Sequence, residues 1–197
     1  MSYLLGLTGS IGMGKSTTCA LFSERGCIIW DADLTVHRAY GIGGAAVEPF
    51  SKILPQVIVK QQINREKLRQ VISENESILP RIEAIIHPLV RRDRQNFISA
   101  NPSSILVFDI PLLFELNAQA DFDAVACVFL EPKVQKERVM ARPGMTKSYF
   151  EMILKKQLPV SEKAARSDYV INTATPRTAV TAVDTILKNI RRKLRNA

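Results

Sequence analysis

The stretch "LLGLTGSIGMGKSTT", residues 4–18, decides the fold of this chain of 197 residues. Its Gly9, Gly14, Lys15 and Ser16 have the spacing G-x-x-x-x-G-K-[ST], which is the pattern of a phosphate-binding loop. An apolar run precedes the pattern and the helical stretch "TTCALFSERG" follows it, as such a loop requires. A glycine-rich turn between a strand and a helix needs no Lys-Ser pair at its end. The stretch therefore predicts that the chain binds a nucleoside triphosphate.

The residue types of this loop suit the chemistry of phosphate binding. Glycines let the backbone approach the phosphates and turn successive N–H groups inward, and the following helix adds its positive dipole end. Lys15 can reach the β- and γ-phosphates, and the hydroxyl of Ser16 can bind Mg²⁺. We expect the ATP-binding residues of the loop to be Gly9, Ser10, Ile11, Gly12, Met13, Gly14, Lys15, Ser16 and Thr17.

Beyond the loop, short apolar runs alternate with helical periodicity, which predicts an α/β fold with a parallel sheet. The expected strands, nearly continuous in apolar residues as in a sheet covered on both faces, are Tyr3–Thr8, Cys27–Trp30, Ile105–Asp109, Ala124–Leu130 and Tyr169–Ile171. The expected helices of this core are 15–25, 33–40, 133–142, 147–157 and 177–195.

A long segment, 34–103, separates the second expected strand from the third. A crossover between parallel strands needs only about a dozen residues, so this connection is oversized. Its stretches "NREKLRQVISEN" (64–75) and "ILPRIEAIIHPLVRRDRQNFISA" (78–100) have apolar residues at helical spacing. We expect one domain, 1–197, that carries a helical insertion.

The composition is that of an ordinary globular protein, with 46% hydrophobic and 23% charged residues. The N-terminus has no basic region of a signal peptide, and no apolar run approaches the roughly 18 residues that a membrane span needs. Cys19, Cys27 and Cys127 are odd in number and widely spaced, as expected of reduced thiols in a core. We expect a cytoplasmic protein with no membrane partner.

The net charge of +8 fits either a nucleic-acid binder or a protein whose small ligands carry phosphates. The densest basic cluster, "KNIRRKLRN" (188–196), ends the last expected helix, where cations complement the helix dipole. No aromatic residues are interleaved there to stack bases. We therefore expect no nucleic-acid partner. A nucleotide-dependent nucleic-acid-binding protein stays an alternative, which steep salt dependence of binding would support.

Motifs that the sequence lacks narrow the class of nucleotide-binding protein. It has no Asn-Lys-x-Asp segment or Asp-x-x-Gly switch of a GTPase, and no Leu-Ser-Gly-Gly signature of a transport ATPase. A compact core with an inserted arm favours a small-molecule kinase. A nucleotide-sensing switch without transfer chemistry is an alternative, and it would bind ATP without acceptor-stimulated release of ADP.

The basic segment "KERVMARPGMTKSYFEMILKKQ", 136–157, suits a lid over the transferring phosphate. Arg138 and Arg142 lie on one helical face, and Pro143 and Gly144 break the helix just after them. Guanidinium groups at such a place stabilise charge on the equatorial phosphate oxygens. The alternative is a solvated basic helix whose charges pair with their neighbours.

Five stretches together resemble the dephospho-coenzyme A kinase family, namely "GLTGSIGMGKST", "DADLTVH", "IIHPLV", "FDIPLLFE" and "ARPGMTKSYFEMILKKQLP". The resemblance runs from Tyr3 to about Thr173. It implies a P-loop kinase three-layer sandwich, with a five-stranded parallel sheet in the order 2-3-1-4-5. It also implies that 34–103 is the substrate-binding arm and 136–157 the lid.

The same resemblance implies the last step of coenzyme A synthesis. The γ-phosphoryl group of ATP is moved to the ribose 3′-hydroxyl of dephospho-coenzyme A with Mg²⁺. We expect a monomer or a weak homo-oligomer. A nucleoside or shikimate-type kinase is the runner-up, and the "HP" and "PLLFE" elements argue against it.

The family pattern assigns the catalytic residues. The second aspartate of "DAD" is the family's proposed base, and it corresponds to Asp33. Such a carboxylate orients the hydroxyl and takes its proton late, because phosphoryl transfer is largely loose. The alternative for Asp33 is an N-cap of the helix 34–40. Asp31 is expected either to be structural or to support the metal or a water indirectly. With Asp33, the expected catalytic residues are Lys15 and Arg142.

The remaining expected contacts also follow from the resemblance. The acceptor is expected at His87, Pro111, Leu112 and Leu113, the metal at Ser16 and Asp109, and further ATP contacts at Arg138 and Asn172.

The sequence departs from the family pattern in two places. Family members have V-I-D-N in the segment expected near the adenine, whereas this chain has "VINTAT". Asn172 and Thr173 thus replace the Asp and the Asn of the pattern. Many members keep an Arg four residues before the lid glutamine, whereas here Ile153 precedes Gln157. The role of Glu115, within "PLLFE", stays open.

Overall fold

The computed structural model describes residues 2–196 and divides the chain into two compact units. The first unit comprises the chain up to Trp30 and from Asn101 onward, and the second comprises Asp31–Ala100. The bounds of the second unit each lie three residues before those of the segment 34–103, for which a helical insertion was expected.

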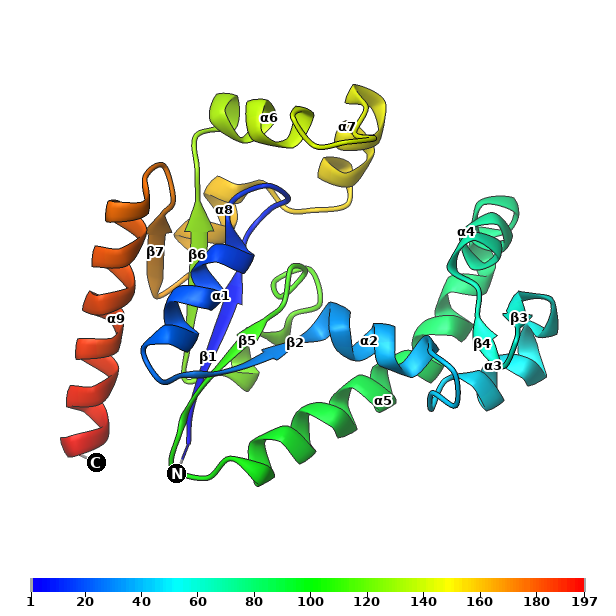
Figure 1. Cartoon of the computed structure of the whole chain (residues 1–197), viewed down its shortest axis with the longest axis horizontal. Helices are drawn as coiled ribbons and strands as arrows, with labels where there is room; N and C mark the ends of the chain where they lie inside the picture. Colours follow the sequence, from blue (N-terminus) through cyan, green and yellow to red (C-terminus); the bar gives the residue numbers. More distant parts are fainter. Residues whose placement is uncertain (1, 197) are drawn as a thin grey trace. The chain divides into compact units, whose positions relative to one another are not determined.

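The first unit is built on a five-stranded parallel sheet (Figure 1). Its strands, in spatial order, are β2 (Ile28–Asp31), β5 (Ile105–Asp109), β1 (Tyr3–Thr8), β6 (Ala124–Phe129) and β7 (Tyr169–Asn172). Counted along the chain this is the order 2-3-1-4-5, so the predicted topology is confirmed. The predicted strands begin and end within one residue of the observed ones, because strands buried on both faces are apolar runs that stand out in a sequence.

Helices cover both faces of this sheet, which confirms the three-layer architecture. Leu5 and Leu7 of β1 pack in one apolar cluster with α1 (Lys15–Glu24) and α9 (Pro176–Asn196). Gly6, between them, faces the other side, where a Cβ would lie 2.7 Å from Leu113 Cδ1. On that side α8 (Val160–Ala165) packs against β6. Pro176 is the first residue of α9, as predicted, because its missing N–H costs nothing there.

Two further helices belong to the first unit. They are α6 (Pro132–Met140) and α7 (Lys147–Lys155), and Gly144 in the connection between them has a φ of 74°. Both correspond to predicted helices, whereas α8 was not predicted. A short 3-10 helix, η3 (Ala118–Asp121), follows the segment after β5.

The second unit has its own apolar core, formed by helices and one small hairpin. Its elements are α2 (Ala32–Tyr40), α3 (Val47–Ile53), η1 (Pro55–Val57), β3 (Ile58–Val59), β4 (Gln62–Ile63), α4 (Arg65–Glu74), η2 (Glu76–Ile78) and α5 (Leu79–Ala100). Phe50, Val57 and Ile63 are among the most deeply buried members of the core. The predicted helices 64–75 and 78–100 are confirmed as α4 and α5, whereas α3 and the antiparallel β3–β4 hairpin were missed.

No helix among residues 2–196 is long and apolar enough to cross a membrane. The two longest helices, α5 and α9, each contain several charged residues.

Candidate active site

The phosphate loop joins β1 to α1, and its backbone favours glycine at Gly12 and Gly14. Gly14 caps α1 with a φ of 86°, in the left-handed region. Gly12 has a φ of 76°, and a Cβ there would collide with Val139 of α6. The first N–H groups of α1 therefore begin directly after the loop, where they can bind phosphate oxygens.

Lys15 and Asp109 form an ion pair at the carboxyl edge of the sheet. Lys15 Nζ lies 3.3 Å from Asp109 Oδ1, and both side chains are largely buried. Lys15 is the first residue of α1, which follows β1. Asp109 is the last residue of β5 and pairs with Leu7 of β1, so the two side chains meet at the same edge of the sheet. The thiol of Cys19 on α1 lies 3.6 Å from Asp109 Oδ2. This arrangement brings a cation that suits phosphate and a carboxylate that suits a metal to the same place.

The oxygens of Ser16 and Asp109 are donors of the kind that Mg²⁺ prefers. Ser16 is exposed and lies in the first turn of α1. Asp109 is the last residue of β5. Within residues 2–196 there is no cluster of three or more His, Cys, Asp or Glu side chains that could hold a metal. The two residues therefore fit an ion that completes its coordination with nucleotide phosphates and water, which is usual for Mg²⁺.

Two glutamine side chains hold the backbone of Ile11, inside the loop. Gln135 Nε2, on α6, donates to the carbonyl of Ile11 at 2.8 Å. Gln157 Oε1 accepts a hydrogen bond from the N–H of Ile11 at 3.3 Å. Gln135 is only 5% exposed, which is unusual for an amide side chain and is explained by this bond. Neither glutamine was predicted to support the loop.

The altered segment after β7 also supports the loop. Thr173 is buried, and its Oγ1 donates to the carbonyl of Met13 at 2.8 Å and lies 3.2 Å from that of Phe129. Asn172 Oδ1 accepts from the N–H of Ala174 at 2.8 Å. The departure from the family pattern therefore has a structural consequence, because the threonine hydroxyl fixes a carbonyl of the phosphate loop.

The two arginines expected at the lid have different environments. Arg138 Nη2 donates to the carbonyls of Thr173 and Ala174, at 3.1 and 3.2 Å, so its guanidinium holds backbone instead of standing free on a lid. Val139, the next residue on α6, is fully buried. Arg142, just after α6, is exposed. Of the two arginines, Arg142 is therefore the one whose surroundings suit a lid cation.

The three residues after β5 that were expected to contact the acceptor also differ in their exposure. Leu112 is 37% exposed, and Pro111 is half-buried. Leu113 is fully buried and faces Gly6 of β1. In this structure the side chain of Leu113 therefore belongs to the core, and its contact with the acceptor stays a prediction.

In the second unit, the structure separates the two aspartates of "DAD". Asp31 is the N-cap of α2, and its Oδ1 accepts from the N–H of Leu34 at 2.8 Å. Asp33 lies in the first turn of the helix and is exposed. The capping role that was the alternative for Asp33 thus belongs to Asp31. His87 is exposed on α5, directly before Pro88, which lies inside that helix.

The cysteines form no disulfide within residues 2–196, as predicted. Cys19, Cys27 and Cys127 are all free thiols, and the last two are buried. Burial raises the pKa of the Cys127 thiol to about 11, although nearby Lys163 opposes the shift. Burial also raises the pKa of Cys27 to about 11. These thiols are protonated at neutral pH, and they are not activated nucleophiles.

The parallel sheet, the phosphate loop and the Lys15–Asp109 pair at its carboxyl edge define a kinase of the P-loop class. Among solved structures, TT1252 from Thermus thermophilus is similar over 98% of both chains, with a TM-score of 0.86 and 27% identity. The dephospho-CoA kinase from Campylobacter jejuni shares the fold, with a TM-score of 0.71 and 22% identity over 98% of this chain and 99% of that one.

The family model of dephospho-CoA kinase matches residues 3–177. The dephospho-CoA kinase of Ruegeria pomeroyi is 52% identical over 97% of both chains, and that of Cereibacter sphaeroides is 43% identical over 96% of both. The chain therefore belongs to the dephospho-CoA kinase family, and it is a kinase of coenzyme A biosynthesis.

Proposed function

We propose that this chain moves the γ-phosphoryl group of ATP to the ribose 3′-hydroxyl of dephospho-coenzyme A, with Mg²⁺. The observation that carries the proposal is the match of the dephospho-CoA kinase family over residues 3–177, together with a complete phosphate loop. The loop N–H groups and Lys15 bind and orient the phosphates, and Lys15 offsets the charge that builds up on the transferring group. Mg²⁺, when held by Ser16 and Asp109, supplies further positive charge to the phosphates.

Asp33 is proposed to orient the acceptor hydroxyl and to take its proton. Its carboxylate is exposed, and it does not serve as the helix cap, because Asp31 does. In the chain it follows β2 by two residues, and parallel strands present their carboxyl ends at the edge where ligands of such sheets bind. A carboxylate of ordinary basicity suffices, since little proton transfer precedes phosphoryl transfer.

The proposal also assigns roles to residues of the lid and to residues that contact the acceptor. Arg142 is proposed to reach the transferring phosphate from the exposed connection after α6. Arg138 and Asn172 are proposed to shape the ATP site through the backbone that they hold. Pro111, Leu112 and His87 are proposed to contact the acceptor. We further propose a cytoplasmic monomer or weak homo-oligomer, and the free thiols support a reducing compartment.

The experiment that tests this function measures ADP release from the purified protein with ATP and Mg²⁺. Dephospho-coenzyme A, adenosine and shikimate are compared as acceptors, and the product is identified by mass spectrometry. Stimulation by dephospho-coenzyme A alone, with a phosphate added at the ribose 3′ position, is expected. Clear ATP binding without stimulation by any acceptor would overturn the proposal.

A further inference from the structure

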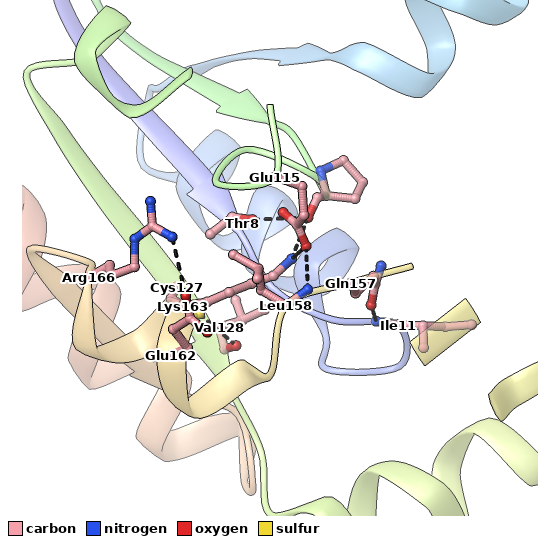
Figure 2. A network of polar contacts seen from close by, with 11 residues as sticks. Thr8, Ile11, Glu115, Cys127, Val128, Gln157, Leu158, Glu162, Lys163 and Arg166 are labelled. Carbon is pink, nitrogen blue, oxygen red and sulfur yellow. Dashed lines mark hydrogen bonds and ion pairs between the residues drawn. The ribbon is translucent and has the colours of Figure 1, made fainter. Parts of the chain in front are cut away.

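A fully buried lysine lies in the first unit, beneath the segment that follows β5. Lys163 of α8 is 0% exposed, and its Nζ lies 2.7 Å from Glu115 Oε1 (Figure 2). The same Nζ donates to the carbonyl of Pro111 at 2.8 Å. The hydroxyl of Thr8, at the end of β1, lies 3.2 Å from that carbonyl. Lysine is almost never buried unless it is paired, so this site is built around its charge.

The carboxylate of Glu115 connects this lysine to the root of the lid. Besides Lys163, its Oε1 accepts a hydrogen bond from the N–H of Leu158 at 2.8 Å. Leu158 lies three residues after the last residue of α7. Glu115 thus holds together α8 and the short connection that leads out of the lid helix.

The residue before Leu158 carries the connection into the phosphate loop. Gln157 Oε1 accepts from the N–H of Ile11, so the segment 157–158 is fixed on both sides. Figure 2 shows the glutamine pointing toward Ile11, while Glu115 and Lys163 lie on the other side of the segment. One chain of contacts therefore runs from Lys163 through Glu115, Leu158 and Gln157 to the loop.

We propose that Lys163 and Glu115 are positioning residues for phosphoryl transfer, which set the Ile11 peptide of the phosphate loop through Gln157. A buried ion pair is seldom more stabilising than well-packed apolar residues of similar volume, so stability alone does not account for it. A requirement for precise geometry accounts for the pair, because a displacement of about 1 Å at a reacting group can lower the rate about a hundredfold. The inference rests on the kinase activity of the family and is independent of the role given to Asp33.

The first test uses Glu115→Gln, Gln157→Ala and the double variant. The glutamine at 115 keeps the shape of the side chain but removes the charge that binds Lys163. The alanine at 157 leaves the ion pair intact and removes only the last link to Ile11. We expect each single variant to lower kcat at least about tenfold. The Kd for ATP, measured by equilibrium binding, should stay within about threefold, because Lys15 and the other loop donors remain.

The double variant separates a common route from two unrelated defects. If both residues act through the same link, breaking it twice costs no more than breaking it once, so the double variant should match the slower single variant. Losses that multiply in the double variant, or an unchanged kcat in Gln157→Ala, would overturn the proposal.

A second double variant, with one control, distinguishes a loss of positioning from a loss of folding. Replacing the pair by apolar residues, Lys163→Met with Glu115→Leu, should leave the protein folded while kcat stays low. The midpoint of thermal unfolding should fall only modestly, because the apolar pair packs in place of the ions but the N–H of Leu158 loses its acceptor. Full kcat in this folded variant would contradict the proposal. The matched control is Glu162→Gln, one residue before Lys163 on α8. Its carboxylate pairs with Arg166 at 3.4 Å on the surface, and its loss should leave kcat unchanged.

Discussion

The phosphate loop and the core of the second unit are held by different kinds of contact. The loop is fixed by polar side chains that bind its backbone, namely Gln135, Gln157 and Thr173. The second unit is held by apolar packing around Phe50 and Val57, with polar contacts at its surface, such as Arg38 to Asp93. Directional bonds fix the position of a peptide group, whereas apolar burial supplies stability without fixing direction. Changes in the loop should therefore affect rate more than stability, and changes in the second core should do the reverse.

The largest effect is expected for Lys15→Ala. The variant loses the ammonium group that offsets charge on the β- and γ-phosphates, so kcat should fall at least about a thousandfold while the protein stays folded. Steady-state ADP release measures the rate, and circular dichroism verifies folding. Lys52→Ala, which removes an exposed lysine paired with Glu48 in the second unit, is the control and should keep full activity. A loss smaller than tenfold in Lys15→Ala would contradict the assignment.

The opposite behaviour is expected for Phe50→Ala. Phe50 is fully buried and its ring packs edge-on against Tyr40, with centroids 5.7 Å apart. Its truncation should lower the free energy of unfolding by about 3–5 kcal/mol, measured by urea denaturation. The Kd for ATP of the folded variant should be unchanged. Ile42→Ala, at a residue that is 73% exposed, should be nearly neutral. A large loss of ATP affinity in Phe50→Ala would break the comparison between the two regions.

Asp33→Asn tests whether the second unit also carries chemistry. The amide keeps the size of the side chain but cannot take a proton, so kcat should fall at least about a hundredfold with ATP affinity preserved. Glu66→Gln is a matched control, since Glu66 is likewise an acidic residue in the first turn of a helix of that unit. Near-normal turnover by Asp33→Asn would show that another group serves as the base.

The smallest effect is expected for Asp31→Ala. Loss of the cap that accepts from the N–H of Leu34 should cost about 1 kcal/mol of stability, measured by urea denaturation. Asp31→Asn, which keeps an accepting oxygen, should restore most of that stability and retain kcat. A hundredfold loss of kcat in Asp31→Asn would mean that Asp31 takes part in catalysis, and that the two aspartates cannot be separated as proposed.

The sequence was most informative where structure is local. The phosphate loop is a contiguous motif, and the buried strands are contiguous apolar runs, so both were predicted from the residues themselves. The order of the strands was predicted only from the resemblance to the family. The β3–β4 hairpin was missed because its turn residues, Lys60 and Gln61, adopt positive φ without glycine or asparagine to signal it. Helix α8 was missed because it is short and its sequence, "VSEKAA", has no apolar periodicity.

The contacts that join distant segments could not be predicted in the same way. Gln157 and Ile11 are 146 residues apart, and nothing in either neighbourhood indicates the other. Lys163 resembles any surface lysine until the fold places Glu115 beside it. Leu113 was assigned to the acceptor because the "PLLFE" element resembles that of the family, whereas the missing side chain of Gly6 makes room for it in the core.

The central strand of the sheet is also the first strand of the chain, and this sets an order of events during synthesis. β1 leaves the ribosome before both of its neighbours, β5 and β6, which end only at Asp109 and Phe129. The hydroxyl that holds the carbonyl of Met13 arrives later still, with Thr173. Residues 31–100 meanwhile form a contiguous segment with an apolar core of its own. We therefore expect the second unit to collapse while the nascent chain is still growing, and nucleotide binding to begin only after Thr173 has been synthesised.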